Sequence, residues 1–387
     1  MSKQAALKFV VLLGLVSLFC DFTHEGARSI IGPYLAILGA SASVVGVVAG
    51  FGELVGNALR LASGYLSDKT GKYWTIMFLG YSLNVAVVPL LALAGSWEMA
   101  SFLMIVERAA RALRTPARDT LVSHAARKIG IGWGFGLHEA MDTTGAILGP
   151  LSVAAMLYCR ASYQSAFFAL LIPAVLTMIA FFVVRSKYPV NRVIGATAAP
   201  KQKVRGFPRM FWLYIGSVCC VALGYADFAL ISYHFQKTSI VTANWVPISY
   251  AVAMCASGLA ALIFGRLFDR IGFVALIIAS AISSFFAPLA FSGNFDLALS
   301  GTVIWGIGVG AQESIMRSAI VNMVPIHRLG VGYGILNTSY GIFWFLGSAF
   351  MGVIYDVSIS YLIIFSIVTQ LLSIPLLLLT MKQLKSP

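Results

Sequence analysis

Charged residues are scarce in this sequence, and their scarcity excludes a soluble domain. Asp, Glu, Lys and Arg make up 11% of the 387 residues, whereas 59% are hydrophobic and the mean hydropathy is +0.88. A water-soluble chain carries about 25% charged residues. Lipid is therefore the expected solvent, and at about 20 residues for each spanning helix the length accommodates about twelve helices.

Signals for cofactors, nucleotides and processing are also lacking. The five cysteines include no CxxC pair, which argues against a disulfide framework, a zinc site or an iron-sulfur cluster, and we expect no cofactor. No glycine stands five residues before Gly71-Lys72, so no Walker sequence occurs and ATP is not the expected energy source. The apolar run from Leu7 continues beyond a cleavable length and carries Asp21 and Arg28, so it is predicted to be a membrane helix.

The net charge of +13 is explained by basic residues placed as expected for a membrane protein. With the N-terminus placed inside, almost all Lys and Arg outside the helices fall in inner segments, and only Arg160 and Lys237 fall in outer ones. Basic residues concentrate on the cytoplasmic side of membrane proteins, so both termini are expected there. A nucleic-acid surface would need a clustered basic face with base-reading residues, so no nucleic-acid partner is expected.

One long polar segment, 185–209, divides the chain. It is basic, contains no acidic residue and is predicted to be a cytoplasmic linker that rests on anionic lipid headgroups. Bundles of six helices are expected on either side, at 1–184 and 210–387. Among the predicted helices are 7–38, 44–67, 75–94, 165–184, 211–234, 273–292 and 361–380, with further helices starting near 100 and 133.

A short motif occurs once in each half. The sequence GYLSDKTGK, with Gly64, Asp68, Gly71 and Lys72, is repeated as GRLFDRIG, with Gly265, Asp269, Arg270 and Gly272. Glycine lets the backbone turn, and aspartate can accept hydrogen bonds from the amides of a helix N-terminus. Each copy lies between two apolar runs and is therefore predicted to be a tight loop between membrane helices in a duplicated chain.

The two copies resemble the signature loop GxLxDxxGRR of the major facilitator superfamily, which joins helices 2 and 3 and recurs between helices 8 and 9. The resemblance covers essentially the whole chain. It implies an all-α integral membrane fold of 12 transmembrane helices in two pseudo-symmetric six-helix bundles. In that family an acid at the inner end of helix 4 receives the basic residue of the loop, which implies an interface lock of Asp68, Lys72 and Asp119. Tyr73 stands where the family usually has its second basic residue.

Ionisable residues inside the predicted helices fall in helices 1, 2, 4, 5, 7 and 10 and not in helices 3, 6, 9 or 12. Such groups cost several kcal/mol when they face lipid, so they must face the protein or a wet cavity. In the resembled fold, helices 1, 4, 7 and 10 line a central cavity, and all four are among the helices that carry the ionisable residues here. The candidates for proton coupling or substrate binding are Asp21, Glu25, Arg28, Arg108, Arg111, Arg114, Glu139, Asp142, Asp227, Glu313 and Arg317.

On helix 1, Asp21, His24, Glu25 and Arg28 share one face at about 100° per residue. A carboxylate in a low dielectric can bind a proton near neutral pH, and a close arginine opposes this. The face is therefore either a coupling site or a paired structural cluster. Asp21, His24 and Glu25 are, as an alternative, candidate ligands of a transported divalent metal.

Helix 4 carries a ladder of arginines. Glu107, Arg111, Arg114 and Arg118 lie within about 60° of one another. Guanidinium groups suit carboxylate or phosphate, so the ladder also suits an anionic substrate, and Arg118 is interpreted as structural. Arg108 resembles the helix 4 arginine of the family's RxxQGxG motif, although Arg111 replaces the glutamine.

Helix 5 contains Gly136, Gly145, Gly149 and Pro150. They resemble the motif Gx8Gx3GPx2GG of drug/proton exporters, although the final glycine pair is absent. Small residues let helices pack closely, and proline imposes a bend. On the same helix, the spacing of His138, Glu139 and Asp142 predicts a mutually satisfied set, for proton carriage or for simple pairing.

The second half carries fewer intramembrane charges. Asp227 has no obvious partner nearby in the sequence, whereas Glu313 and Arg317 are spaced as an i,i+4 pair. Asn337, Tyr340 and Trp344 share a face, which suits either packing or an aromatic contact with substrate.

The expected function is proton-coupled export of a small organic molecule by alternating access, driven by a gradient. The alternatives are import of a polar or anionic metabolite or metal chelate, divalent-metal transport, and a membrane-embedded enzyme, for which no nucleophile and base stand in a recognisable frame. The expected partners are the substrate, protons and the bilayer. We expect a monomer in a bacterial inner membrane.

Overall fold

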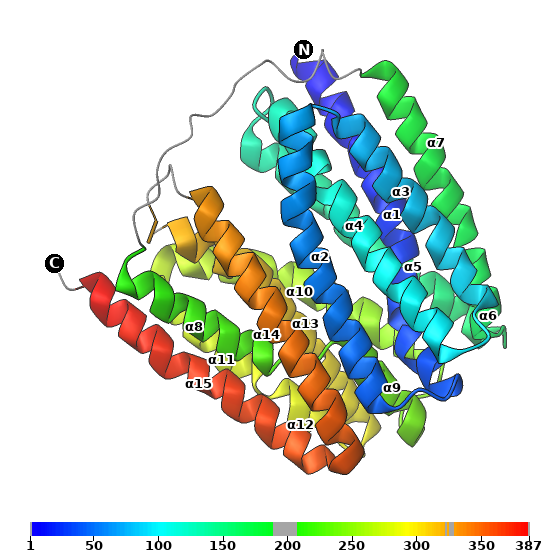
Figure 1. Cartoon of the computed structure of the whole chain (residues 1–387), viewed down its shortest axis with the longest axis vertical. Helices are drawn as coiled ribbons and strands as arrows, with labels where there is room; N and C mark the ends of the chain where they lie inside the picture. Colours follow the sequence, from blue (N-terminus) through cyan, green and yellow to red (C-terminus); the bar gives the residue numbers. More distant parts are fainter. Residues whose placement is uncertain (1, 189–206, 322, 325–328, 386–387) are drawn as a thin grey trace. The chain divides into compact units, whose positions relative to one another are not determined.

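The computed structural model describes residues 2–188, 207–321, 323–324 and 329–385. Within these ranges it contains helices and no strands (Figure 1). The helices are α1 (Lys3–Ile37), α2 (Ala42–Thr70), α3 (Tyr73–Leu90), η1 (Leu91–Leu93), α4 (Trp97–Ala126), α5 (Ile131–Tyr158), α6 (Tyr163–Ala169), α7 (Leu171–Lys187), α8 (Arg209–Leu223), α9 (Phe228–Thr238), α10 (Trp245–Ile271), α11 (Val274–Ser283), α12 (Phe286–Ala290), α13 (Phe295–Val321), α14 (Leu329–Val357) and α15 (Ile359–Lys385).

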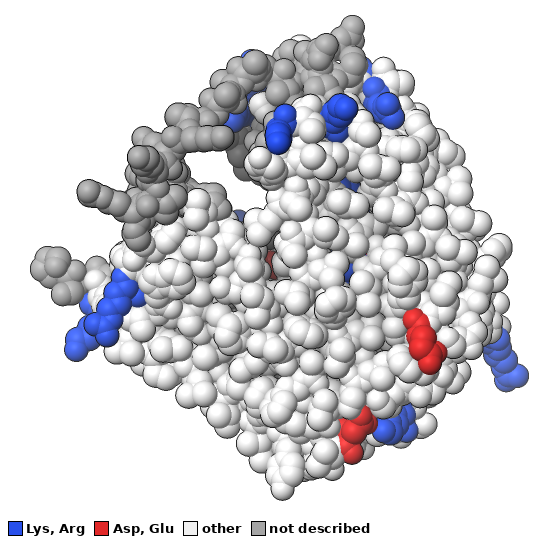
Figure 2. Space-filling view, in the orientation of Figure 1, with Lys and Arg blue, Asp and Glu red and all other residues white. Residues whose placement is uncertain are grey.

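The predicted number of membrane passages is confirmed. Nine segments of the described chain are long and apolar enough to cross a bilayer. The remaining helices that a count of twelve requires are α4, α13 and the shorter apolar pair α11–α12. Few charged side chains appear on the face drawn in Figure 2, as a lipid-exposed surface requires.

The chain divides into two compact units. Unit 1 comprises residues 1–30 and 55–203, and unit 2 comprises residues 31–54 and 204–387. The core of unit 1 is aromatic at one end, where Trp74 of α3 contacts Phe9 of α1 at 6.4 Å and Phe181 of α7 at 5.6 Å between ring centroids.

In unit 2, the Tyr214 hydroxyl of α8 donates to the Met316 carbonyl of α13 over 2.7 Å. Its core also contains Phe273, whose ring contacts Tyr214 edge-on at 5.9 Å.

The repeated motif is more helical than predicted. The sequence predicts a loop over each copy, but α2 continues to Thr70 and α10 continues to Ile271, so only the last glycine of each copy turns the chain. Gly71 has φ +65° and Gly272 has φ +60°, a left-handed conformation that side chains other than glycine adopt with strain. The duplicated glycine is thus explained by a duplicated turn.

The duplication also extends to helix packing. A Cβ added to Gly149 of α5 would collide with the Phe22 carbonyl of α1, and one added to Gly347 of α14 would collide with the Leu223 carbonyl of α8. Each glycine therefore lets two backbones approach closely at matching places in the two units.

The helix predicted over 211–234 is interrupted, because residues 224–227 leave the helix between α8 and α9. The Gly224 carbonyl accepts hydrogen bonds from Ser366 Oγ over 2.7 Å and from Gln370 Nε2 over 3.3 Å. Buried polar side chains on α15 thus satisfy backbone that the helix no longer satisfies.

The helix predicted over 273–292 is likewise divided, into α11 and α12.

Candidate functional site

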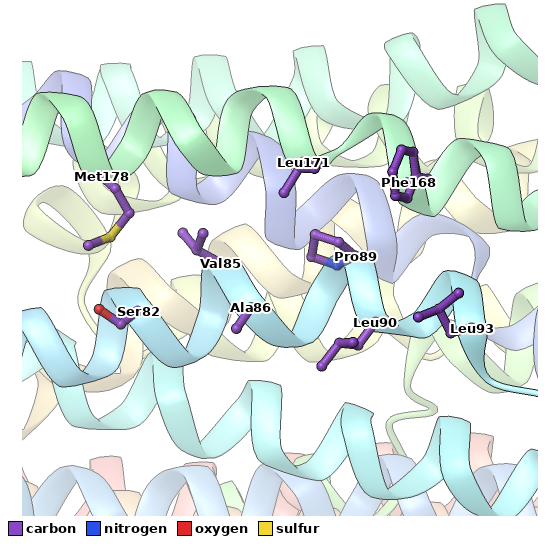
Figure 3. Close-up of a pocket in the computed structure, with 9 residues that line it drawn as sticks. All are labelled: Ser82, Val85, Ala86, Pro89, Leu90, Leu93, Phe168, Leu171 and Met178. Atoms are coloured by element: carbon purple, nitrogen blue, oxygen red, sulfur yellow. The ribbon is translucent and has the colours of Figure 1, made fainter.

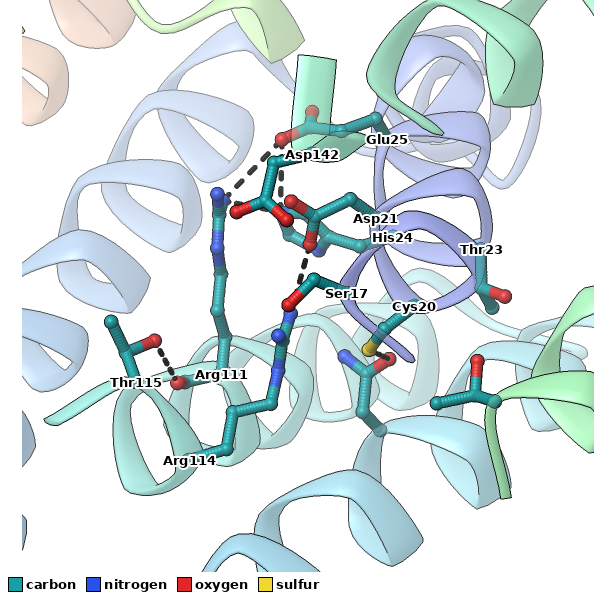
Figure 4. A network of polar contacts seen from close by, with 12 residues as sticks. Ser17, Cys20, Asp21, Thr23, His24, Glu25, Arg111, Arg114, Thr115 and Asp142 are labelled. Atoms are coloured by element: carbon teal, nitrogen blue, oxygen red, sulfur yellow. Dashed lines mark hydrogen bonds and ion pairs between the residues drawn. The ribbon is translucent and has the colours of Figure 1, made fainter. Parts of the chain in front are cut away.

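The ionisable residues of α1 and α4 face one another inside unit 1 as ion pairs. Arg114 NH2 lies 3.0 Å from Asp21 Oδ1, and both side chains are buried. One turn along each helix, Arg111 NH1 lies 3.4 Å from Glu25 Oε1. Figure 4 shows both arginines extending from α4 toward the carboxylates of α1. The polar face predicted for helix 1 is therefore the face that meets α4.

Helix α5 adds a third carboxylate. Arg118 NH1 lies 3.1 Å from Asp142 Oδ2, and His138 Nδ1 lies 3.6 Å from the same oxygen. Ser17 of α1 joins the group, since its Oγ accepts from Arg118 NH1 over 3.2 Å and lies 3.1 Å from His138 Nε2. Arg118, which the sequence analysis treats as structural, thus contacts a candidate carboxylate directly. Glu139 is exposed.

Helical spacing explains how α4 meets three carboxylates. Arg111, Arg114 and Arg118 stand at i, i+3 and i+7, on one stripe of the helix. Each guanidinium lies against a different carboxylate, and removing one partner of a buried pair typically costs about 3–5 kcal/mol. We refer to the following residues as the charge cluster: Asp21, Glu25, Arg111, Arg114, Arg118 and Asp142.

Buried polar side chains connect α3 to the charge cluster, and two of them, Cys20 and Asn84, were not predicted as site residues. His24 Nδ1 lies 2.5 Å from Glu107 Oε1, and Asn84 Nδ2 donates to the same oxygen over 2.6 Å. Asn84 Oδ1 accepts from the Cys20 thiol over 3.3 Å, and His24 Nε2 lies 2.7 Å from Arg111 NH1. The available signal was a lone asparagine in an otherwise apolar helix, because a buried amide requires partners.

This arrangement can link protonation to the positions of arginines. A carboxylate that gains a proton loses its charge, so its attraction to the guanidinium falls. The guanidinium then needs another acceptor or water, because an unpaired buried charge is costly. His24 lies between Glu107 and Arg111, so a change at either residue alters the contacts of the other.

Two further first-half candidates lie on α1 and α4. Arg28 NH1 is 3.9 Å from Glu25 Oε2, and Arg108 is buried on α4.

The geometry does not support the alternative of a metal site. Asp21 and Glu25 lie against arginines, and His24 lies between Glu107 and Arg111. Among the residues that the structure describes, no group of three His, Cys, Asp or Glu side chains could hold a metal ion.

The predicted interface lock is described only in part. Asp119 Oδ1 accepts from Arg118 Nε over 2.9 Å, and Lys72 is exposed. The side chain of Asp68 lies outside the described residues. In the second copy of the motif, Asp269 is exposed.

The helix 5 motif positions the third carboxylate. A Cβ on Gly145 would collide with the Leu18 carbonyl of α1, one turn before the contact of Gly149 with the same helix. Gly136, by contrast, has no neighbouring atom within 4 Å of such a Cβ. Two of the three glycines therefore allow the close approach of α5 to α1 that brings Asp142 near Ser17 and Arg118.

The second-half candidates lie in several settings. Asp227, predicted to lack a local partner, caps α9, since its buried Oδ1 accepts from Ala229 N over 3.0 Å. Glu313 is exposed, and the side chain of Arg317, its predicted partner, lies outside the described residues.

The predicted aromatic face is present on α14. The rings of Tyr340 and Trp344 lie 5.4 Å apart, and Asn337 is partly buried.

Unit 1 also has an apolar pocket of about 340 Å³ between α3, η1, α6 and α7 (Figure 3). Its lining contains none of the predicted site residues, and Ser82 is its one polar side chain. The lining residues are Ser82, Val85, Ala86, Pro89, Leu90, Leu93, Phe168, Leu171 and Met178.

Known proteins resemble this chain along its whole length. The family model of the Major Facilitator Superfamily matches residues 13–348 and 220–386. An uncharacterised protein of Mycobacterium tuberculosis (strain H37Rv) is 39% identical over 378 residues, which cover 96% of this chain and 92% of that protein. An uncharacterised MFS-type transporter of Methanocaldococcus jannaschii is 25% identical over 372 residues, which cover 91% and 95%.

Solved transporters share the fold. A variant of the peptide transporter POT superposes with a TM-score of 0.77 at 14% identity and covers 99% of this chain and 98% of its own. The nucleoside transporter NupG gives 0.73 at 14% identity, with 98% and 100% covered.

The helical fold, its membrane-spanning segments and the matching family model define a multi-pass membrane transporter. The chain belongs to the Major Facilitator Superfamily of secondary transporters, which bind small-molecule substrates. The identity to the solved structures is low enough that they show the fold alone.

Proposed function

We propose that the protein is a proton-coupled secondary transporter that exports a small organic molecule from the cytoplasm by alternating access. The observation that carries the proposal is the charge cluster, in which three carboxylates face three arginines inside a membrane-embedded unit. Ionisable groups held at such positions commonly mark the pathway of an ion or substrate.

In the proposed cycle, a proton and an arginine compete for one carboxylate. Protonation of Asp21 or Asp142 weakens its pair with Arg114 or Arg118. The freed guanidinium takes another acceptor, and the contacts that join α1, α4 and α5 change with it. The signature loop, through Asp68, is proposed to lock the cytoplasmic side until these contacts change.

The export direction rests on the helix 5 motif, which resembles that of drug/proton exporters. Gly145 and Gly149 allow α5 and α1 to pack closely, as such a motif requires. The motif thereby couples the position of α5, which carries Asp142, to the position of α1.

Import of a polar or anionic metabolite or metal chelate is the second candidate, because Arg111 differs from its two neighbours on α4. Its side chain is 28% exposed, compared with 1% for Arg114 and 12% for Arg118. A substrate carboxylate or phosphate could therefore replace Glu25 on Arg111 in fork geometry.

The proposed setting is a monomer in a bacterial inner membrane with both termini in the cytoplasm. The basic linker 185–209 is proposed to rest on anionic headgroups. Residues 189–206 of that linker lie outside the described residues.

Transport by the purified chain in proteoliposomes under an imposed pH gradient tests the proposal. The probes are tetraphenylphosphonium and ethidium as lipophilic cations, and benzoate and citrate as anions. We expect at least one probe to move with the gradient, and Asp21→Asn and Glu25→Gln to lose that dependence while Glu98→Gln, at an exposed glutamate outside the candidate set, retains it.

Unchanged gradient dependence in both helix α1 variants would remove α1 from coupling. A strong preference for the lipophilic cations would exclude the anion importer.

A further inference from the structure

Two neighbouring helices of unit 2, α13 and α14, each bury an N–H donor that has no acceptor among the described residues. The donors are Nε2 of Gln312 on α13 and the indole Nε1 of Trp344 on α14. The two residues are 8% and 6% exposed. A buried donor left unpaired is costly, so native proteins satisfy nearly all of them with protein, water or ligand.

Tyr340 joins the two donors. Its hydroxyl donates to Gln312 Oε1 over 2.9 Å. The carbonyl oxygen of this amide is therefore paired, whereas its NH2 group has no partner among the described residues. Its ring lies 5.4 Å from that of Trp344, which in turn lies 5.5 Å from the ring of Tyr225 at the break between α8 and α9. The unpaired donors therefore lie beside a row of three aromatic rings.

A neighbouring tryptophan shows that this part of the fold can provide a hydrogen-bond acceptor for an indole N–H. Trp305 lies 6.2 Å from the same Tyr225 ring, and its Nε1 donates to the Ala226 carbonyl over 2.9 Å. The described residues thus supply a backbone acceptor for Trp305 and none for Trp344. This contrast points to an acceptor that comes from outside the chain.

The chemistry of the donors defines that acceptor. Both are neutral N–H groups, which bind a carbonyl oxygen or a ring nitrogen without requiring a charge. The aromatic rings beside them favour stacking with a flat group. Binding sites of this kind combine apolar and aromatic walls with a few placed polar groups.

We propose that Gln312, Tyr340 and Trp344 form a subsite for a planar, neutral, acceptor-bearing part of the substrate. The assignment of this ligand as the transported molecule rests on the proposed function. The binding itself does not, since it requires no gradient and no charge cluster.

Binding by the full chain in detergent, without a gradient, tests the subsite. Nicotinamide and 2-pyridone are the probes, because both are flat, neutral and carry a carbonyl. Tetraphenylphosphonium, an aromatic cation without an acceptor, is the comparison compound. We expect at least one carbonyl probe to raise the thermal midpoint of the wild type and to bind more tightly than the cation.

Trp344→Phe keeps an aromatic ring and removes only the N–H, so it should raise the Kd of that probe about tenfold. Gln312→Met should have a similar effect and serves where the first variant folds poorly. Trp212→Phe makes the same change at an exposed tryptophan and should leave the Kd unaltered.

Three results would overturn the subsite: no midpoint shift with either carbonyl probe, stronger binding of the cation, or wild-type affinity in both variants. The last is also the result expected if ordered water satisfies the donors. Transport that fails in proteoliposomes while the Kd differences persist would refute the proposed function and leave the subsite standing.

Discussion

Units 1 and 2 carry the same repeated motif and the same glycine contacts, yet they bury different polar chemistry. In unit 1, α1, α4 and α5 bring carboxylates and guanidinium groups together as pairs. In unit 2, the corresponding region buries mainly neutral groups around the break between α8 and α9. A membrane-embedded polar group thus needs a partner, which can be an opposite charge or a neutral hydrogen-bonding side chain.

The two units share close helix packing at glycines but differ in the polar residues beside those contacts. Gly149 and Gly347 permit equivalent close approaches in the two units. The residues beside them differ, since titratable groups face α4 in unit 1 whereas aromatic rings and amides gather near Tyr225 in unit 2. Under our proposals, unit 1 handles protons and unit 2 contacts the substrate.

The largest effect should come from breaking a buried charge pair in unit 1. Arg114→Ala leaves Asp21 without its guanidinium and should destabilise the protein by about 3–5 kcal/mol. Reversible unfolding in mixed micelles measures this, with exposed Arg127→Ala as the control. Adding Asp21→Asn should recover part of the loss, and a cost below about 1 kcal/mol for Arg114→Ala would show that the pair contributes little.

Overpacking the duplicated glycine contacts should produce the next largest effect, similar in both units. Gly149→Val and Gly347→Val each place side-chain atoms against a carbonyl and should cost about 1–3 kcal/mol or more. Gly136→Ala, which has open space, is the matched control. If the thermal midpoint falls in one variant only, the two contacts are not equivalent.

The contribution of neutral hydrogen bonds in unit 2 can be tested at the break between α8 and α9. Ser366→Ala combined with Gln370→Met removes both side-chain donors to the Gly224 carbonyl and should cost about 1–3 kcal/mol. The same unfolding assay applies. Ser373→Ala, on the same helix, removes only a local bond and should have the smaller effect.

A single neutral link in unit 1 should matter less. Asn84→Leu removes a donor to Glu107 and an acceptor for the Cys20 thiol, with an expected cost of about 1 kcal/mol. Because Glu107 contacts His24, the variant should also alter the gradient dependence of transport. If the Asn84→Leu variant has wild-type stability and transport, α3 does not contribute to the charge cluster.

The smallest effect is expected at an exposed charge of unit 2. Glu313→Gln should change stability by less than about 0.5 kcal/mol, because substitutions of exposed residues are usually near neutral. A drop comparable with that of Arg114→Ala would show that Glu313 has a buried partner.

Local signals in the sequence predicted much of the fold. Hydropathy gave the helices, the spacing of the repeat gave the two copies, and Gly71 and Gly272 mark turns whose φ values explain their recurrence. The loop around each motif was predicted too long, because helical hydrogen bonding continues to the residue before the glycine. The break at Gly224 was missed because its hydrogen-bond donors, such as Gln370, lie more than one hundred residues away.

Part of the charge cluster was likewise predicted. The shared face of Asp21 and Glu25 follows from helical periodicity alone. The roles of Arg118 and Asn84 do not, since each depends on which helix packs against which.

Membrane spanning, the duplication and the positions of the turns are all readable in the amino-acid sequence. These properties follow from the transfer of side chains into lipid and from the conformational freedom of glycine, which each short segment expresses independently. The packing of the helices was needed to show which arginine meets which carboxylate and that the Trp344 indole has no acceptor among the described residues. Partners for buried polar groups come from helices distant in sequence, and their identity is fixed by packing over a few ångströms.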